Sequence, residues 1–188
     1  MNEKAALLVI DVQNSATARD GKVTVGCERC DAPIENMNSL IELADRESWD
    51  IYYVAHVTPW YHFLPAAATH FAFMKGSEGA RFDRRLDVVN KAVFTKMFGS
   101  ALSNFRLKRL LKDTGVRSVV LCGLATDACV LASAKSAKSA GYDVTVVSDA
   151  CVGRTDEAAA EACAQMGARG ILIAQTSDLL PATAPAEN

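Results

Sequence analysis

Hydrophobic and polar positions divide the chain into two kinds of segment. Six short apolar runs, rich in β-branched side chains, are each followed by a polar loop or by a stretch with helical spacing. Continuous runs of this kind are typical of parallel strands that are buried on both faces. The expected strands cover residues 5–10, 51–55, 92–95, 118–122, 143–147 and 170–174.

Helical spacing appears in the stretches between these runs. Apolar residues at positions i, i+3 and i+4 predict a helix over residues 32–47. Further helices are expected over 100–114, 131–140 and 156–166, and each of these three is followed by a glycine, where a left-handed C-cap favours one.

The alternation of strands and helices, without internal repeats or a linker, predicts one α/β domain over residues 1–188. Right-handed crossovers place helices on both faces of a mainly parallel sheet, which gives a three-layer α/β/α sandwich. Ligands of such sheets bind at the carboxyl ends of the strands, where the strand order reverses. A strand order of 3-2-1-4-5-6 would place the first and fourth strands side by side at that point.

The composition of the chain argues against some classes of binding partner. The 188 residues are 50% apolar and 22% charged, and the formal net charge is −2 with no run of Lys or Arg. This balance argues against nucleic acid or an anionic membrane as the main partner. No apolar stretch has the length of a membrane span, and no targeting segment is evident, so we expect a cytoplasmic location.

Six cysteines are present, but the chain does not have the character of a small disulfide-bonded scaffold. Cys27 and Cys30 form a C-x-x-C pair in a loop, without the strand-to-helix context of a redox motif or a second pair for zinc. We therefore expect no metal or redox role there. Cys122, Cys151 and Cys163 lie among small or apolar residues and are expected only to pack.

Residues 58–91 form a long irregular connection that is rich in aromatic side chains. Connections of this length in a compact domain usually have a function. Exposed aromatic residues there would line a pocket or contact another subunit, and the alternative is that they cover the edge of the core. We expect substrate contacts from Gln13, Trp60, Tyr61, Phe63 and Leu124.

Three chemically active residues follow different strands at the same sheet edge. Asp11 follows the first strand, Lys96 the third, and Cys129 lies in or near the first turn of the helix after the fourth. Neighbouring strands lie about 5 Å apart, so Asp11 would reach the thiol, and the long Lys96 side chain would cover much of about 10 Å. A cation and a helix N-terminus favour a thiolate, and a carboxylate can accept the thiol proton.

Three segments carry a resemblance to a known family: Asp11-Val12-Gln13-Asn14, residues 96–102 (KMFGSAL) and residues 123–130 (GLATDACV). They resemble, in the same order, the signatures of the isochorismatase-like cysteine hydrolases, which include nicotinamidases and N-carbamoylsarcosine amidase. The resemblance spans about residues 4–176 and implies the isochorismatase-like hydrolase fold.

The resemblance implies a catalytic triad of Asp11, Lys96 and Cys129, with an oxyanion hole formed by the backbone N–H groups of Ala125 and Cys129. It also implies a cis peptide between Leu124 and Ala125. The implied reaction is hydrolysis of a C–N bond in a small amide, carbamoyl or ureido compound through a thioester, without a cofactor. Relatives commonly assemble, so we expect a homo-oligomer, either a dimer or a tetramer.

Departures from the family leave alternatives open. Nicotinamidases hold a metal through an Asp-x-His pair after the second strand, and residues 55–62 contain no aspartate. His56, His62 and His70 could still form a metal site, although we expect none. The alternatives to an amidohydrolase are a vinyl ether hydrolase of the isochorismatase type and a catalytically silent binding protein. A nucleotide-binding protein is disfavoured, because the chain has neither G-x-G-x-x-G after the first strand nor a P-loop.

Overall fold

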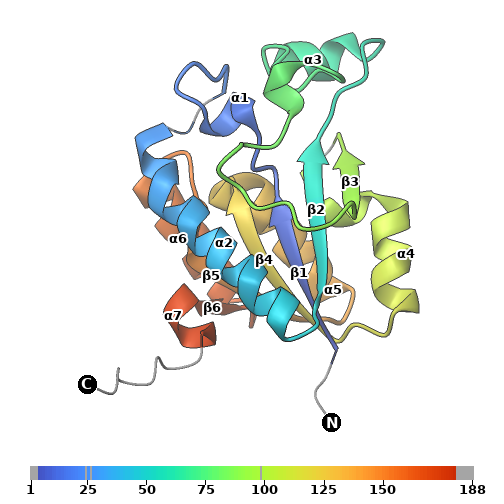
Figure 1. The fold of residues 1–188 in the computed structure, drawn as a ribbon, viewed down its shortest axis with the longest axis vertical. Helices are drawn as coiled ribbons and strands as arrows, with labels where there is room; N and C mark the ends of the chain where they lie inside the picture. Colours follow the sequence, from blue (N-terminus) through green and yellow to red (C-terminus); the bar gives the residue numbers. More distant parts are fainter. Residues whose placement is uncertain (1–3, 24, 26, 98, 181–188) are drawn as a thin grey trace.

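A six-stranded parallel sheet forms the centre of the computed structural model, which describes residues 4–23, 25, 27–97 and 99–180 (Figure 1). Its strands are β1 (Ala5–Ile10), β2 (Asp50–His56), β3 (Val93–Lys96), β4 (Ser118–Leu124), β5 (Asp143–Val152) and β6 (Leu172–Ala174). The strand order is β3-β2-β1-β4-β5-β6, and every pairing is parallel. The predicted fold class and strand order are therefore confirmed.

Helices cover both faces of this sheet, as right-handed crossovers require. The helices are α1 (Asn14–Thr17), α2 (Asp31–Arg46), α3 (Phe63–Ala68), α4 (Phe105–Asp113), α5 (Leu131–Ser139), α6 (Asp156–Gly167) and α7 (Thr176–Leu179). α2 contacts α7 on one face, and α5 contacts α6 on the other. Among the described residues, no helix is both long and apolar enough to cross a bilayer.

Several predicted boundaries were wrong. The helix expected over 100–114 is a 3₁₀ turn at Ala101–Ser103 followed by α4, because the Asn104 side chain accepts the Leu107 N–H and begins a new helix. β5 runs five residues beyond its predicted end at 147, to Val152. Gly167 is the last residue of α6, where the prediction placed it after the helix, and the short α7 was not predicted. The sequence also predicts a loose tail around Pro181 and Pro185, which lies outside the described residues.

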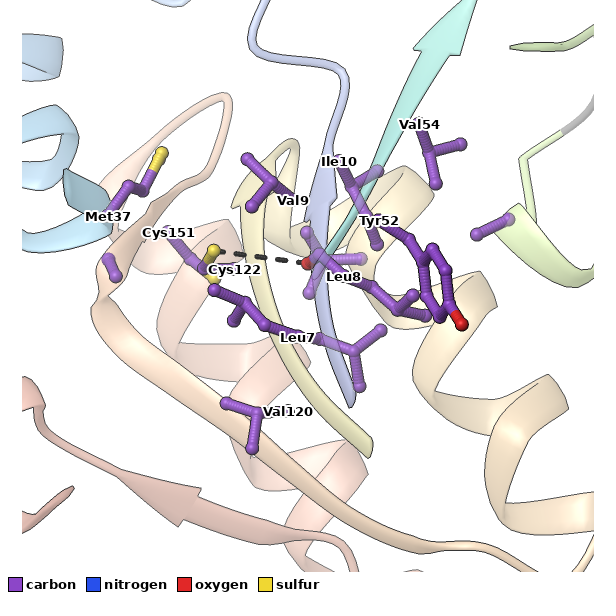
Figure 2. Packing of buried hydrophobic residues seen from close by; sticks show 14 of the residues in the cluster. Leu7, Leu8, Val9, Ile10, Met37, Tyr52, Val54, Val120, Cys122 and Cys151 are labelled. Carbon is purple, nitrogen blue, oxygen red and sulfur yellow. Dashed lines mark hydrogen bonds between the residues drawn. The ribbon is translucent and has the colours of Figure 1, made fainter. Parts of the chain in front are cut away.

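The core is centred on β1, every residue of which is buried. Figure 2 shows Leu7 to Ile10 of β1 packed against Val120 and Cys122 of β4. The Cys122 sulfur lies 3.9 Å from the Leu8 carbonyl oxygen, and Cys151 of β5 lies in the same cluster. These two thiols are buried in the core, where burial raises the pKa of Cys122 to about 12.

Gly123 allows the end of β4 to approach β1 closely. Its φ is +119°, and a Cβ built on it would lie 2.1 Å from the Ile10 carbonyl oxygen. No residue with a side chain fits at that distance, and the positive φ also favours glycine. The glycine therefore brings the ends of β1 and β4 together, and both strands lead directly into the candidate site.

Residues 57–92 connect β2 to β3. Their first part lies over the carboxyl end of the sheet, where α3 sits above β2 in Figure 1, and their last part runs back along β2, where the Asn90 side chain donates to the Ile51 carbonyl. Thr58 N donates to the Phe73 carbonyl, and Asp83 N donates to the Val12 carbonyl, so the connection is tied to β2 and to the loop after β1. The predicted irregular connection thus contains one short helix and a 3₁₀ turn at Glu78–Ala80.

Candidate active site

Asp11, Lys96 and Cys129 meet at the carboxyl edge of the sheet. Lys96 Nζ lies 2.7 Å from Asp11 Oδ2 and 3.2 Å from Cys129 Sγ. The side chains of Lys96 and Asp11 are 0% and 7% exposed, whereas Cys129 is half-buried. One ammonium group therefore bridges a carboxylate and a thiol in a largely dry environment.

The strands determine how these side chains meet. Asp11 follows the last residue of β1 with a φ of 55°, a conformation that an L-residue adopts only at a cost, and its N–H donates to the Val54 carbonyl of β2. Lys96 pairs with His56 at the end of β2, so its side chain passes over the end of that strand to reach Asp11.

Ser133 connects the segment after Lys96 to the helix after Cys129. Its hydroxyl accepts the Ala101 N–H at 2.8 Å and donates to the Cys129 carbonyl at 2.7 Å. The side chain is fully buried, so these two bonds replace contacts that water would otherwise provide. Ser133 was not predicted as part of the site, although its position one helical turn after Cys129 could have indicated that it lies nearby.

Electrostatics keep the resting thiol protonated. Burial raises the pKa of Cys129, the Asp11 carboxylate raises it further, and nearby Lys96 lowers it, with a net value of about 12. The net shift is upward because desolvation and the Asp11 carboxylate outweigh the Lys96 cation. Burial lowers the pKa of Lys96, but Asp11 and Cys129 more than compensate and raise it overall.

Asp11 has one oxygen available for proton transfer. Oδ2 contacts Lys96, whereas the buried Oδ1 has no hydrogen-bond partner among the described residues. A buried carboxylate oxygen without a partner is costly, and such groups are concentrated at functional sites. Oδ1 is thus suited to accept a proton from a thiol or an N–H donor.

The turn that carries Cys129 begins with a cis peptide between Leu124 and Ala125. Residues Thr126–Val130 form a single π-helical turn that leads into α5. The Ala125 carbonyl accepts the N–H groups of Ala128 and Val130, and Ala125 and Cys129 are both partly accessible. The two N–H groups predicted to hold an oxyanion therefore belong to one compact turn.

Asp127 fastens this turn to the loop after β5. Its carboxylate accepts the Arg154 backbone N–H at 3.1 Å and Arg154 Nε at 2.5 Å. The Asp127 side chain is 7% exposed, and hydrogen bonds from Arg154 lower its pKa despite the opposing effect of burial. The geometry agrees with a structural rather than a chemical role for Asp127.

Gln13 does not present its amide to a ligand, contrary to the predicted substrate contact. Its Nε2 donates to the carbonyls of His56 and Ala80, at 3.0 and 2.7 Å, and its Oε1 accepts the His56 N–H at 2.8 Å. The residue is fully buried. Gln13 therefore joins the loop after β1 to the end of β2 and to the 58–91 connection.

The other predicted substrate contacts divide into exposed and buried residues. Trp60, Tyr61 and Phe63 are 80%, 65% and 67% exposed, and Trp60 and Tyr61 stack edge to face. Leu124 is buried at the end of β4. The structure thus places the three aromatic side chains at the surface of the connection and Leu124 in the core.

The described histidines do not converge on one another as metal ligands would. His56 packs against Phe73, and His62 contacts the Tyr61 ring. Within the described ranges, no group of three or more His, Cys, Asp or Glu residues is arranged to hold a metal ion. Cys30 is buried, and the side chain of Cys27 lies outside the described part.

Fold and site together define a parallel α/β protein with an Asp–Lys–Cys cluster at its topological switch point. The chain belongs to the isochorismatase family, because the Isochorismatase domain model matches residues 5–178. The suspected family is thereby confirmed.

Similar proteins agree with this assignment. An uncharacterized isochorismatase family protein of Bacillus subtilis, YrdC, is 28% identical over 80% of this chain and 74% of its own length. The structure of a pyrazinamidase/nicotinamidase from Streptococcus mutans is 27% identical, with a TM-score of 0.81 over 90% of this chain and 99% of that one. An isochorismatase family protein from Desulfovibrio vulgaris shares the fold, with a TM-score of 0.84 at 24% identity over 95% and 97% of the two chains.

Proposed function

We propose that this protein is a cysteine hydrolase that cleaves a C–N bond of a small amide, carbamoyl or ureido compound. Cys129 is the nucleophile, Asp11 the general base and acid, and Lys96 the cation that holds both. The observation that carries this proposal is the contact of one buried ammonium with both a carboxylate and a thiol.

The first half of the reaction forms a thioester. Asp11 accepts the thiol proton as the Cys129 sulfur bonds to the substrate carbonyl carbon, and the carbonyl electron pair moves onto oxygen. The N–H groups of Ala125 and Cys129 hold that oxyanion. The tetrahedral intermediate then collapses, the C–N bond breaks, and the nitrogen leaves with the proton from Asp11.

The second half returns the enzyme to its resting state. Asp11 accepts a proton from water, the resulting oxygen nucleophile attacks the thioester, and the C–S bond breaks. The Cys129 sulfur takes up the proton that Asp11 accepted from water, and the acid or carbamate product leaves. A thiol with a pKa of about 12 fits this scheme, because deprotonation is coupled to attack and does not precede it.

Two further expectations accompany the proposal. The exposed large hydrophobic residues around α3, including Trp60 at 80% and Leu64 at 80% exposed, favour assembly of two or four copies. A cytoplasmic location is expected as well. A monomer at micromolar concentration in light scattering would contradict the assembly.

The decisive experiment is intact-mass spectrometry of the wild type and Cys129→Ala after brief mixing with small amides, carbamoyl compounds and ureas. Ammonia release is followed in parallel. An acyl adduct on the wild type alone, together with ammonia, supports the proposal. Ammonia release that persists in Cys129→Ala would refute the covalent mechanism. A wild type that binds these compounds without adduct or ammonia would favour a silent binding protein.

A further inference from the structure

His56, the last residue of β2, lies beside the ion pair of Asp11 and Lys96. It pairs with Lys96 of β3, and residues that pair across neighbouring strands point to the same face of the sheet. On this face Tyr52 of β2 and Phe94 of β3 also meet edge to face, with ring centroids 5.8 Å apart. The His56 side chain therefore leaves the sheet on the face from which Lys96 reaches Asp11.

The His56 ring is held in place, but its nitrogens are not engaged. Gln13 binds both the N–H and the carbonyl of His56, at 2.8 and 3.0 Å, and the ring packs against Phe73 with centroids 5.0 Å apart. Within the described part of the chain, neither ring nitrogen forms a hydrogen bond or an ion pair. Both nitrogens retain accessible surface. A small ligand can therefore reach a ring that the fold has already positioned.

The imidazole of His56 is neutral at neutral pH. Burial lowers the pKa of His56 below its usual value, the Lys96 cation lowers it further, and the Asp11 carboxylate opposes both effects only in part. A neutral imidazole has one nitrogen that donates a hydrogen bond and one that accepts a hydrogen bond. The candidate site thus has a neutral acceptor that Lys96 does not occupy.

The strand order places His56 and the turn of Cys129 on opposite sides of Asp11. β1 lies between β2 and β4, Asp11 follows β1, and Cys129 follows β4. Neighbouring strand ends are about 5 Å apart, a span that one water molecule bridges with two hydrogen bonds of about 2.8 Å each. A water between Asp11 and His56 would therefore stand beside an acyl group on Cys129.

A hydrolytic water needs two acceptors at this edge of the sheet. Asp11 Oδ1, which has no partner among the described residues, accepts the first hydrogen in the proposed reaction. The main-chain carbonyls nearby each accept another hydrogen bond already: those of Asp11, Val54, His56 and Lys96. Among these groups, the ring nitrogen of His56 is the acceptor that is left.

We propose that a ring nitrogen of His56 accepts the second hydrogen of the hydrolytic water while Asp11 accepts the first. The inference rests on the proposed function, in which water hydrolyses a thioester at Cys129. The two acceptors direct the oxygen lone pair at the acyl carbon. The proton that moves to Asp11 passes on to the sulfur, so His56 keeps its protonation state. His56 therefore acts in the second half of the reaction and not in the attack by the thiol.

The test separates the two halves with p-nitrophenyl acetate, which acetylates a thiol and releases p-nitrophenolate. In stopped-flow absorbance the burst reports formation of the acetyl thioester, and the steady phase reports its hydrolysis. His56→Phe keeps an aromatic ring against Phe73 but has no nitrogen. We expect it to leave the burst rate within about twofold of the wild type and to slow the steady phase about tenfold.

Three further variants control this measurement. His56→Asn and His56→Gln each place an amide oxygen near one or the other ring nitrogen, and at least one of them should recover most of the steady rate. The matched control is His62→Phe, which replaces a histidine whose ring contacts the exposed Tyr61 and should change neither phase. Cys129→Ala gives the background from the other cysteines.

The outcomes separate this inference from the proposed function. A steady phase that is as fast in His56→Phe as in the wild type, with the burst intact, overturns the role of His56 while the hydrolase stands. Equal slowing of both phases would indicate that His56 only supports the fold of the site, and it overturns the inference as well. A wild type that forms no acetyl adduct on Cys129 by intact mass would overturn the nucleophile and this inference with it.

Discussion

The Asp11→Asn variant should make the Cys129 thiol more reactive while it abolishes turnover. In the wild type, burial and the Asp11 carboxylate both raise the pKa of Cys129, and Lys96 alone lowers it. Replacing the carboxylate by an amide removes one of the raising contributions. Lys96 then has the thiolate as its only anionic partner at the site, so the charged form of the thiol gains stability.

The structure gives a lower bound on the size of this effect. Asp11 Oδ2 and Cys129 Sγ both contact Lys96 Nζ, at 2.7 and 3.2 Å, so they lie no more than about 5.9 Å apart. Two unit charges at that separation repel by about 3 kcal/mol at an effective dielectric constant of about 20. Because about 1.4 kcal/mol corresponds to one pKa unit, the pKa of Cys129 should fall from about 12 by about 2 units.

The assay is the rate of alkylation by iodoacetamide between pH 6 and 10, followed by intact mass. A fall of about 2 units in the pKa raises the thiolate fraction at pH 8 about a hundredfold. The thiolate of a more acidic thiol is a weaker nucleophile, which lowers the rate constant of alkylation by somewhat less than tenfold. We therefore expect a net acceleration of about tenfold or more. Cys129→Ala gives the background from the other five cysteines. An unchanged or slower rate in Asp11→Asn would refute the assignment of Asp11 as the group that holds the thiol protonated.

The remaining predictions concern the supports of the site. Ser133→Ala leaves the buried Ala101 N–H unpaired and should lower the free energy of unfolding by about 1–3 kcal/mol in urea titrations, whereas Ser133→Thr should retain most of it. Equal losses in the two variants would contradict the role of the hydroxyl. Burial opposes ionisation of Asp83, but Arg85 and Thr17 hydrogen bonds lower its pKa from 3.8 to about 2, so Asp83→Asn should cost about 2 kcal/mol at pH 7. Most of that deficit should be lost as the pH falls from about 4 to 2, and a deficit as large at pH 2 as at pH 7 would contradict it.

The sheet could be predicted because its signal is local. A strand buried on both faces reads as a continuous apolar run, and β1 was predicted with its observed limits at residues 5 and 10. Helix ends marked by a glycine were also found, as at Gly141 with a φ of 90°. The break between the 3₁₀ turn at Ala101–Ser103 and α4 was missed, because it depends on whether the Asn104 side chain turns back to cap a helix.

The residues that form the candidate site could be predicted from the sequence, but the pKa shifts within the site could not. Asp11, Lys96 and Cys129 stand at strand ends, and the topology alone brings strand ends together. The raised pKa of Cys129 depends on how deeply the sulfur is buried and on which charge outweighs the other. Neither quantity follows from residue spacing.

Gln13 shows why the role of a residue can be predicted wrongly even when the residue lies in a family motif. A glutamine two positions after Asp11 is polar and close to the site, so a substrate contact was the natural expectation. Its amide instead forms three bonds to backbone groups of His56 and Ala80, which are distant in sequence. Satisfying those buried groups is a requirement of the folded chain, and it becomes visible only when the three segments meet.

Long-range hydrogen bonds of this kind explain how three separate strand ends keep fixed positions relative to one another. Gln13 joins the loop after Asp11 to the end of β2, which pairs with Lys96. Ser133 joins the segment after Lys96 to the carbonyl of Cys129. The two side chains thus complete a loop of contacts around Asp11, Lys96 and Cys129, one on each side of Lys96. Lys96 contacts both a carboxylate and a thiol. Removing the hydrogen bonds of Gln13 should therefore disturb mainly the contact between Lys96 and Asp11, and removing those of Ser133 should disturb mainly the contact between Lys96 and Cys129.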